Sequence, residues 1–150
     1  MVDFGQEIPI ACDHAGFCLK TALLKTLSLE GFHLKDFGTF SEESVDYPDY
    51  THPLAKAVND GLYQKGIIIC GSANGVAMVA NKYPKVRSAV CWTDDIARLA
   101  RMHNDANIIA LPARFISTEE ALSMIRIFFS TDFEGGRHLR RVEKIPIPTR

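Results

Sequence analysis

Short apolar runs alternate along the chain with segments in which apolar residues recur at helical spacing. The runs that predict β-strands are Ile8–Cys12, Phe32–Phe37, Ile67–Cys70, Arg87–Trp92 and Ile108–Leu111. A segment with a helical apolar face follows each run, as at Leu19, Leu23 and Leu27 after the first. Strands that alternate with helices predict a parallel sheet. We therefore expect an α/β fold, a three-layer α/β/α sandwich around a five-stranded parallel Rossmann-like sheet.

The ends of several helices carry local signals. Thr93 is expected to cap one helix, and Ser117 opens a capping box with Glu120 for another. The helix that carries Val76 is expected to extend to Tyr83, just before a proline. Near the carboxyl terminus, residues 132–136 form a linker, and residues 137–144 are expected to be helical again.

Two prolines shape the prediction for the second helix. Pro48 disfavours helical geometry at Tyr47, so Tyr47 is expected to be extended, in the long loop that begins at Gly38. The helix itself is expected to begin near Tyr50, because Pro53 is tolerated in a first turn.

Composition narrows the class of protein. A length of 150 residues with 47% hydrophobic and 23% charged residues is typical of one soluble domain. We expect residues 1–150 to form a single domain with a C-terminal helical extension from about residue 133. The net charge of −1 gives no general attraction to nucleic acid or to a membrane surface. No leader pattern opens the sequence, and its four cysteines lack metal-ligand spacing. These features predict free thiols, a cytoplasmic location, and no metal or other cofactor.

The strand Ile67–Cys70 leads into the small and turn-forming residues Gly71–Gly75, and then into a helix. Such a loop presents backbone N–H groups to an anion. Cys70 lies at its mouth, where a thiol is more readily activated as a base or nucleophile. The same pattern is also an ordinary strand-to-helix connection, and a cysteine at a strand end is often only a small buried apolar residue.

Other polar residues follow the predicted strands. Asp13 and His14 come directly after the first strand, and Arg114 follows the fifth. The carboxyl ends of parallel strands share one edge, where ligands of open α/β sheets bind. We therefore expect these residues to lie near the Cys70 loop. An equally good interpretation of Asp13 by itself is that it caps the following helix.

Two further groups lie elsewhere in the sequence. His103 and Asn104 precede the fifth strand, so they are expected at the opposite edge unless the chain doubles back or a second subunit supplies them. Arg137 and Arg141 are four residues apart, so a helix directs both guanidinium groups the same way, as suits a phosphate dianion. By itself, this pair fits a solvated basic helix end equally well. Together, the polar groups indicate proton transfer on a small phosphorylated molecule.

Five motifs in order are similar to those of a known family. They are Asp13-His14-Ala15-Gly16, Asp46-Tyr47-Pro48, Cys70-Gly71-Ser72 with Ala80-Asn81-Lys82, His103-Asn104-Asp105, and Phe133-Glu134-Gly135-Gly136-Arg137-His138. The sequence resembles the sugar-phosphate isomerase family that holds ribose-5-phosphate isomerase B and the galactose-6-phosphate isomerase subunits. The resemblance extends from about Ile8 to Ile145.

The resemblance implies a metal-independent aldose–ketose isomerase that interconverts D-ribose 5-phosphate and D-ribulose 5-phosphate through an enediolate, a step of the pentose phosphate pathway. His103 would help to open the furanose ring, Cys70 would move the proton between C2 and C1, and Asp13 would orient sugar hydroxyls. The Ser72 hydroxyl and the loop amides would hold the oxyanion. The other substrate-binding residues implied in this way are His14, Tyr47, Gly71, Ala73, Asn74, Gly75, Asn104, Arg114, Arg137, His138 and Arg141. The resemblance also implies a homodimer or homotetramer, with sites built from two subunits.

Two positions depart from the family pattern. Some relatives carry a glutamate base where this chain has Val76, which leaves Cys70 as the base here. The family loop usually has glycine at the position of Ala73, so alanine would be strained if that position has a positive φ.

Two alternative functions remain at the level of sequence. A six-carbon substrate, galactose 6-phosphate or allose 6-phosphate, needs the same chemistry in a pocket of different size. A non-catalytic sugar-phosphate-binding domain is disfavoured, because mere binding does not require Cys70, Ser72 and His103 together.

Overall fold

Five parallel strands form the central sheet of the computed structural model, which describes residues 5–149. The strands are β1 (Glu7–Cys12), β2 (His33–Asp36), β3 (Gly66–Cys70), β4 (Ser88–Val90) and β5 (Ile108–Pro112). Their order across the sheet is β2-β1-β3-β5-β4, and each neighbouring pair is parallel. The predicted fold class is therefore confirmed, including the number of strands.

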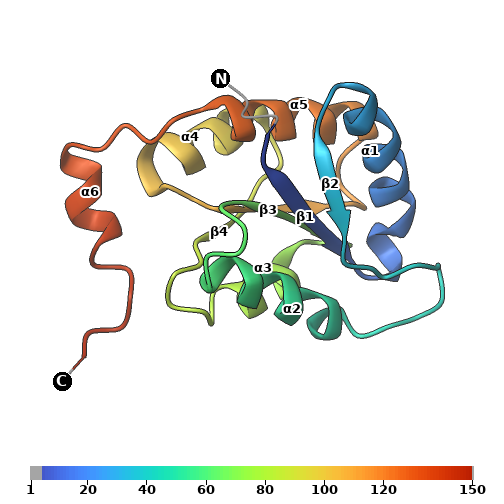
Figure 1. Ribbon diagram of the computed structural model, residues 1–150, viewed down its shortest axis with the longest axis horizontal. Helices are drawn as coiled ribbons and strands as arrows, with labels where there is room; N and C mark the ends of the chain where they lie inside the picture. Colours follow the sequence, from blue (N-terminus) through green and yellow to red (C-terminus); the bar gives the residue numbers. More distant parts are fainter. Residues whose placement is uncertain (1–4, 150) are drawn as a thin grey trace.

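Helices cover both faces of this sheet (Figure 1). They are α1 (Phe17–Leu29), α2 (Tyr47–Asn59), α3 (Asn74–Ala80), α4 (Asp94–Asn104), α5 (Thr118–Ser130) and α6 (Arg137–Val142), with a short 3-10 turn, η1, at His14–Gly16. One hydrophobic cluster joins the sheet to α1, α4 and α5, and a second joins it to α2 and α3. The sheet is thus the middle layer of three.

Strand β3 supplies side chains to both clusters. Ile67 and Ile69 pack in the cluster with α1, α4 and α5, whereas Ile68 and Cys70 pack in the cluster with α2 and α3. Successive side chains of a strand point to opposite faces, so a strand at the centre of a sandwich is apolar throughout. All five residues of β3 are buried, which explains the continuous apolar run in the sequence.

Helix α2 corrects one expectation. It begins at Tyr47 rather than near Tyr50, and the first turn contains Pro48 while Pro53 lies inside the helix. A proline in the first turn lacks only an N–H that would have no partner within the helix. Pro48 therefore starts this helix, and Tyr47 is its first residue instead of part of an extended loop.

Other elements are shorter than expected. β2 covers His33–Asp36, β4 covers Ser88–Val90, α3 ends at Ala80, and α6 ends at Val142. Side-chain contacts explain two of these ends. Asn81 exchanges hydrogen bonds of 2.8 and 3.0 Å with the backbone of Ser88, directly after α3. The backbone N–H of Arg87 donates to the side chain of Asn107 at 2.8 Å, just before β4 begins.

The strand order creates a switch point between β1 and β3. From β1 the chain crosses to β2 on one side, and from β3 it crosses to β4 on the other. In open α/β sheets, ligands bind in the crevice beyond the carboxyl ends of the strands at such a point. Cys12 and Cys70 are the last residues of these two strands, so Asp13 and the Cys70 loop follow directly at the crevice.

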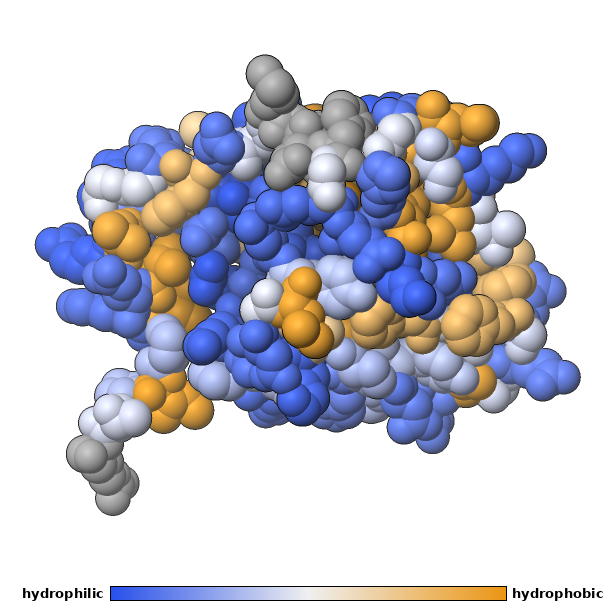
Figure 2. Space-filling view, in the orientation of Figure 1, coloured by the Kyte–Doolittle hydropathy of each residue, from blue (hydrophilic) through white to orange (hydrophobic). Residues whose placement is uncertain are grey.

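The carboxyl-terminal segment extends away from the sandwich. Helix α6 lies beside α4, and the residues after it project from the body (Figures 1 and 2). Ile147 in this segment is 91% exposed, and Ile145 is 54% exposed. Figure 2 shows that hydrophilic residues predominate on this face and that apolar side chains gather in separate patches. Among the helices formed by residues 5–149, none has the length and apolar character needed to cross a bilayer.

Candidate active site

A cleft of about 470 Å³ lies at the carboxyl ends of β1, β3 and β5. Its lining residues are Asp13, His14, Ala15, Tyr47, Cys70, Gly71, Ser72, Gly75, Arg114 and Phe115. Four separate segments of the sequence meet here, at the switch point of the sheet. Most of the site residues predicted before β4 are therefore brought together with Arg114 in one cleft.

The loop after β3 makes a tight turn at Ala73. This residue is fully buried and left-handed, with φ 64° and ψ −8°. A left-handed conformation costs a residue with a Cβ about 1–2 kcal/mol, so the expected strain at Ala73 is present. The Ser72 hydroxyl accepts a hydrogen bond of 3.3 Å from the backbone N–H of Asn74 across this turn. Unlike Ser72, neither Ala73 nor Asn74 contributes to the lining of the cleft.

Two glycines of this loop permit close packing by other cleft residues. A Cβ atom at Gly75 would lie 2.6 Å from Cζ of Tyr47, and one at Gly71 would lie 3.2 Å from Nη1 of Arg114. Any side chain at Gly75 would therefore displace the tyrosine ring. The backbone N–H of Arg114 also donates to the carbonyl of Gly71 at 3.1 Å, which ties the two loops together.

The hydrogen bonding of His14 determines which nitrogen carries its proton. The backbone N–H of Val45 donates to Nδ1 of His14 at 3.2 Å. An amide N–H can only donate, so Nδ1 is an acceptor and the neutral ring carries its proton on Nε2. His14 can therefore offer an N–H donor through Nε2 without becoming charged.

Asp13 has a structural role that the sequence left open. Its carboxylate accepts a hydrogen bond of 3.1 Å from the backbone N–H of Gly16 and caps the turn η1. Asp13 therefore caps this turn rather than the following helix α1, whose N-cap is Gly16, and the same residue also lines the cleft. Gly16 packs tightly, since a Cβ there would lie 2.7 Å from Cγ2 of Ile69. The backbone around Asp13 is consequently held against β3.

The cysteines fall into different environments. Burial raises the pKa of Cys12 to about 11 and that of Cys91 to about 12, so both remain protonated at neutral pH. The exposed thiol of Cys18 donates to the carboxylate of Glu42, a contact that raises its pKa. Of the four cysteines, Cys70 lines the cleft, although only 5% of its surface is exposed.

A second cavity of about 320 Å³ lies between the end of α4 and α6. It is lined by His103, Asn104, His138, Arg141, Val142 and Ile145. The rings of His103 and His138 stack, with centroids 4.1 Å apart and an interplanar angle of 11°. Burial, followed by the nearby His103, Arg137 and Arg141, lowers the pKa of His138, an effect that Glu134 partly opposes. Arg137 is exposed and does not line either cavity.

The two cavities share no lining residue. His103 lies near the end of α4, which leads into the amino end of β5, whereas Cys70 lies at the carboxyl end of β3. The candidate residues of one chain therefore form two separate groups.

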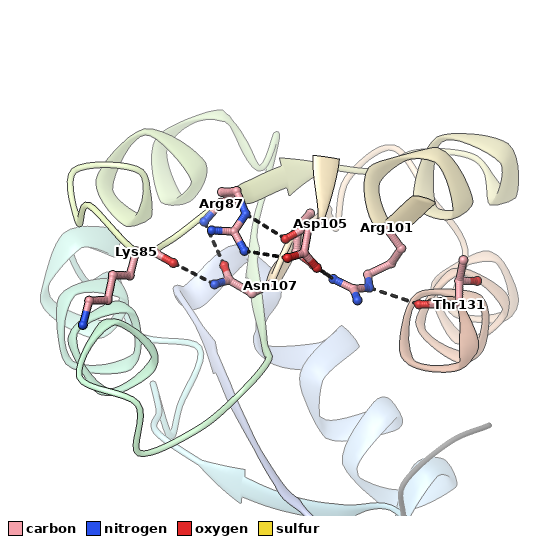
Figure 3. A network of polar contacts seen from close by, with 7 residues as sticks. Lys85, Arg87, Arg101, Asp105, Asn107 and Thr131 are labelled. Atoms are coloured by element: carbon pink, nitrogen blue, oxygen red, sulfur yellow. Dashed lines mark hydrogen bonds and ion pairs between the residues drawn. The ribbon is translucent and has the colours of Figure 1, made fainter. Parts of the chain in front are cut away.

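A charged network holds the turn after His103 and Asn104 (Figure 3). Asp105 is left-handed, with φ 46°, and its carboxylate accepts from Arg101 at 2.9 Å and from Arg87 at 3.1 Å. Arg101, which is 6% exposed, also donates to the carbonyls of Ala106 and Thr131, at 2.6 and 3.2 Å. The network thus joins the end of α4 to the start of β4 and the end of α5.

Sequence reasoning did not identify this network. Its members are far apart in the sequence, and a charged residue such as Arg101 on a helix is usually assigned to solvent. One available signal was Asp105, which follows His103 and Asn104 within a motif. Asparagine and aspartate are the residues other than glycine that adopt left-handed geometry most readily, so this position fits a helix end.

The fold and the main cleft together indicate the class of protein. The sheet is doubly wound, and the cleft at its switch point, where ligands of such sheets bind, is lined by a cysteine, a histidine and an arginine among other residues. A family model described as Ribose/Galactose Isomerase matches residues 8–145. The chain therefore belongs to the ribose/galactose isomerase family.

Individual relatives agree with this assignment. Ribose-5-phosphate isomerase B of Escherichia coli K12 is 39% identical over 140 residues, which cover 93% of this chain and 94% of the relative. A ribose 5-phosphate isomerase structure from Thermotoga maritima has 45% identity and a TM-score of 0.91, covering 94% of this chain and 97% of its own. Ribose-5-phosphate isomerase B of Mycoplasma genitalium, solved with bound ribulose 5-phosphate, has 38% identity and a TM-score of 0.88, covering 93% of each chain.

Proposed function

We propose that this protein is a type B ribose-5-phosphate isomerase, which interconverts D-ribose 5-phosphate and D-ribulose 5-phosphate in the pentose phosphate pathway. The observation that supports the proposal is the cleft at the switch point, whose lining residues include Cys70, Asp13, His14 and Arg114. A relative with the same fold has been solved with ribulose 5-phosphate bound.

The isomerisation moves two protons. We propose that Cys70, as the thiolate, takes the proton from C2 of the open-chain aldose, and that the electrons form an enediolate with its charge on O1. The Ser72 hydroxyl and backbone N–H groups of the Gly71–Gly75 loop donate to that oxygen. Cys70 then returns the proton to C1, while the O2 hydroxyl proton is transferred to O1. No step requires a metal ion, because the thiol and the donors supply the acid–base and electrostatic functions.

The substrate is held at both ends in this proposal. Asp13 orients the sugar hydroxyls, and Tyr47 lines the wall of the cleft. His14 donates to the phosphate through Nε2–H, and Arg114 adds a guanidinium group. The neutral tautomer of His14 supports this role, since the amide of Val45 keeps Nδ1 as the acceptor.

A second copy of the chain completes the site in our proposal. His103 and Asn104 of that copy assist opening of the furanose ring, and its Arg137, His138 and Arg141 bind the phosphate. The two separate cavities support this arrangement, because each contains only part of the expected set. Exposed apolar side chains adjoin both cavities, such as Phe115 at 75% and Ile145 at 54% exposed. We therefore propose a homodimer, or a tetramer built from such dimers.

Two broader features complete the proposal. We assign residues 1–150 to a single domain, because both hydrophobic clusters share the same sheet. We also assign the protein to the cytoplasm, since the cysteines at residues 12, 18, 70 and 91 are free thiols, as suits a reducing compartment.

Turnover assays with purified protein test this function. Ribose 5-phosphate is compared with galactose 6-phosphate and allose 6-phosphate, and we expect the highest kcat/KM for the five-carbon substrate. Cys70→Ala should lower kcat roughly 10²-fold or more, the usual contribution of a general base. Cys18→Ala is the control, because this exposed thiol lies outside both cavities. A folded Cys70→Ala protein with near-normal kcat, or a wild type that prefers a six-carbon substrate, would contradict the proposal.

A further inference from the structure

Three side chains at or beside the second cavity bring potential metal ligands close together. His103, Glu134 and His138 each offer one ligand atom, and these atoms all lie within 4.8 Å of one another. Nε2 of His103 is 3.8 Å from Oε2 of Glu134, and Nε2 of His138 is 4.0 Å from Oε1 of the same carboxylate. These separations are too long for direct hydrogen bonds. The three side chains therefore lie close together without hydrogen bonds between the imidazoles and the carboxylate.

The imidazole of His138 is the most unusual member of this group. The residue is only 5% exposed, and its Nε2 atom is buried without a hydrogen-bond partner. Within the part of the chain that the structure describes, only Ser88 Oγ shares this condition. A buried polar atom that lacks a partner loses its hydration without compensation, so such atoms often indicate an unoccupied ligand position.

The chemistry of the group suits a transition-metal cation. Two imidazoles and one carboxylate are a ligand set that proteins use for zinc, with a fourth position open to water. Bonds of 2.0–2.1 Å in a tetrahedron place ligand atoms about 3.3 Å apart. The two imidazole–carboxylate separations need to shorten by about 0.5–0.7 Å, which Glu134 can supply because its side chain is 52% exposed. Binding of both imidazoles to one ion also requires the stacked rings of His103 and His138 to rotate out of their nearly parallel arrangement.

We propose that His103, Glu134 and His138 form an inhibitory site for a divalent transition-metal cation such as Zn²⁺. The metal is not required for activity. It binds instead to two imidazoles that the proposed function assigns to ring opening and phosphate binding, so it excludes the substrate. Binding of the metal is independent of the proposed function, whereas competition with substrate rests on it.

The surroundings set limits on the affinity and on the choice of metal. Arg141 lines the same cavity, and its positive charge opposes a cation. We therefore expect a Kd on the order of micromolar for Zn²⁺ rather than the tighter binding of structural zinc sites. Mg²⁺ prefers oxygen ligands in octahedral geometry, so it should neither bind nor inhibit at similar concentrations.

Calorimetric titration with ZnCl₂ and the visible absorption of the Co²⁺ complex test binding directly. The variant is Glu134→Gln, which keeps the shape of the side chain but removes the anionic ligand. Glu143→Gln is the matched control, because Glu143 is an exposed carboxylate just after α6 and outside this group. We expect one Zn²⁺ per chain, with the Kd raised about ten-fold or more by Glu134→Gln and unchanged by Glu143→Gln.

Inhibition of turnover provides a second readout. Zn²⁺ should act competitively with ribose 5-phosphate, and Glu134→Gln should raise its inhibition constant in step with the Kd, relative to the variant's own rate. Absence of Zn²⁺ binding, or binding that Cys70→Ala removes and Glu134→Gln leaves unchanged, would overturn the proposal. Glu134-dependent binding by a protein that does not turn over ribose 5-phosphate would support the metal site and refute the isomerase function.

Discussion

At the scale of single residues, the two arginines of α6 that were predicted to bind phosphate differ in their position relative to the second cavity. Arg137 and Arg141 lie four residues apart in this helix, as expected, but only Arg141 lines the cavity with His138. The proposed contributions of the two residues are therefore unequal, and Arg141 is the stronger candidate.

This difference gives a kinetic prediction. Arg141→Ala should raise KM for ribose 5-phosphate roughly ten-fold to a hundred-fold, because a charged hydrogen bond contributes about 1.5–3 kcal/mol. The effect on kcat should be smaller, since the phosphate is remote from C1 and C2. Arg141→Lys should restore part of the loss, because lysine keeps the charge but lacks the paired N–H groups. Steady-state kinetics of the purified variants provide the measurement.

Arg140 is the control within the same helix. It is exposed and lies about 100° around the helix from Arg141, so Arg140→Ala should leave KM nearly unchanged. The phosphate assignment would have to be abandoned if Arg140→Ala were as damaging as Arg141→Ala, or if Arg141→Ala kept the wild-type KM.

The residues of the main cleft could be located from sequence because they follow strand ends. Asp13 comes directly after the first buried apolar run, and Cys70 is the last residue of another. Because the strands are parallel, their carboxyl ends lie at the same edge of the sheet. The positions of Glu134 and Arg101 in the structure could not be predicted from strand ends in this way. Their contacts join segments that no local pattern relates, such as Arg101 with the carbonyl of Thr131. Such contacts depend on the packing of α4 against α5, which the sequence pattern does not specify in detail.

At the scale of secondary-structure elements, the end of α4 depends on Asp105. Its carboxylate binds both Arg87 and Arg101, and Arg101 is left without this partner when the carboxylate is removed. Asp105→Ala also places alanine at φ 46°, a conformation that aspartate and asparagine adopt more readily because their short polar side chains can hydrogen-bond locally. We predict that Asp105→Ala lowers the free energy of unfolding by about 1–3 kcal/mol, below the value for a fully buried pair because Asp105 is one-third exposed.

Two further variants make the Asp105 prediction specific. Asp105→Asn should lose less stability than Asp105→Ala, because asparagine tolerates left-handed geometry. Asp95→Asn removes an exposed ion pair with Arg98 in the same helix and should change stability by less than about 1 kcal/mol. Urea unfolding measures all three variants. Equal destabilisation by Asp105→Ala and Asp95→Asn would show that the network does not hold the end of α4.

The predicted elements were most accurate where local and tertiary preferences agree. The cap at Thr93 and the capping box of Ser117 with Glu120 are both present, because these contacts are made within a single turn. The predicted start of α2, near Tyr50, lies three residues after the observed start at Tyr47. The prediction assigns Pro48 to the preceding loop, whereas it lies in the first turn of the helix. The early end of α3 depends on Asn81 contacting Ser88, a pairing that no helix propensity encodes.

At the scale of the whole molecule, the chain carries two groups of candidate site residues that do not meet. The main cleft contains the thiol, and the second cavity contains the stacked imidazoles. A two-fold symmetric dimer presents the same surfaces in both directions, so each thiol cleft would receive the imidazoles of the other copy. The projecting carboxyl-terminal segment, with its exposed Ile147, offers apolar surface for such an association.

Complementation between two inactive variants tests this shared site most directly. Cys70→Ala and His103→Ala should each have little activity alone. After subunit exchange in an equal mixture, half of the dimers contain both variants, and each of these has one intact site. We therefore predict recovery of about a quarter of the wild-type turnover of ribose 5-phosphate. If subunit exchange is demonstrated and activity does not recover, the two cavities do not form one site, and the account of a shared active site is wrong.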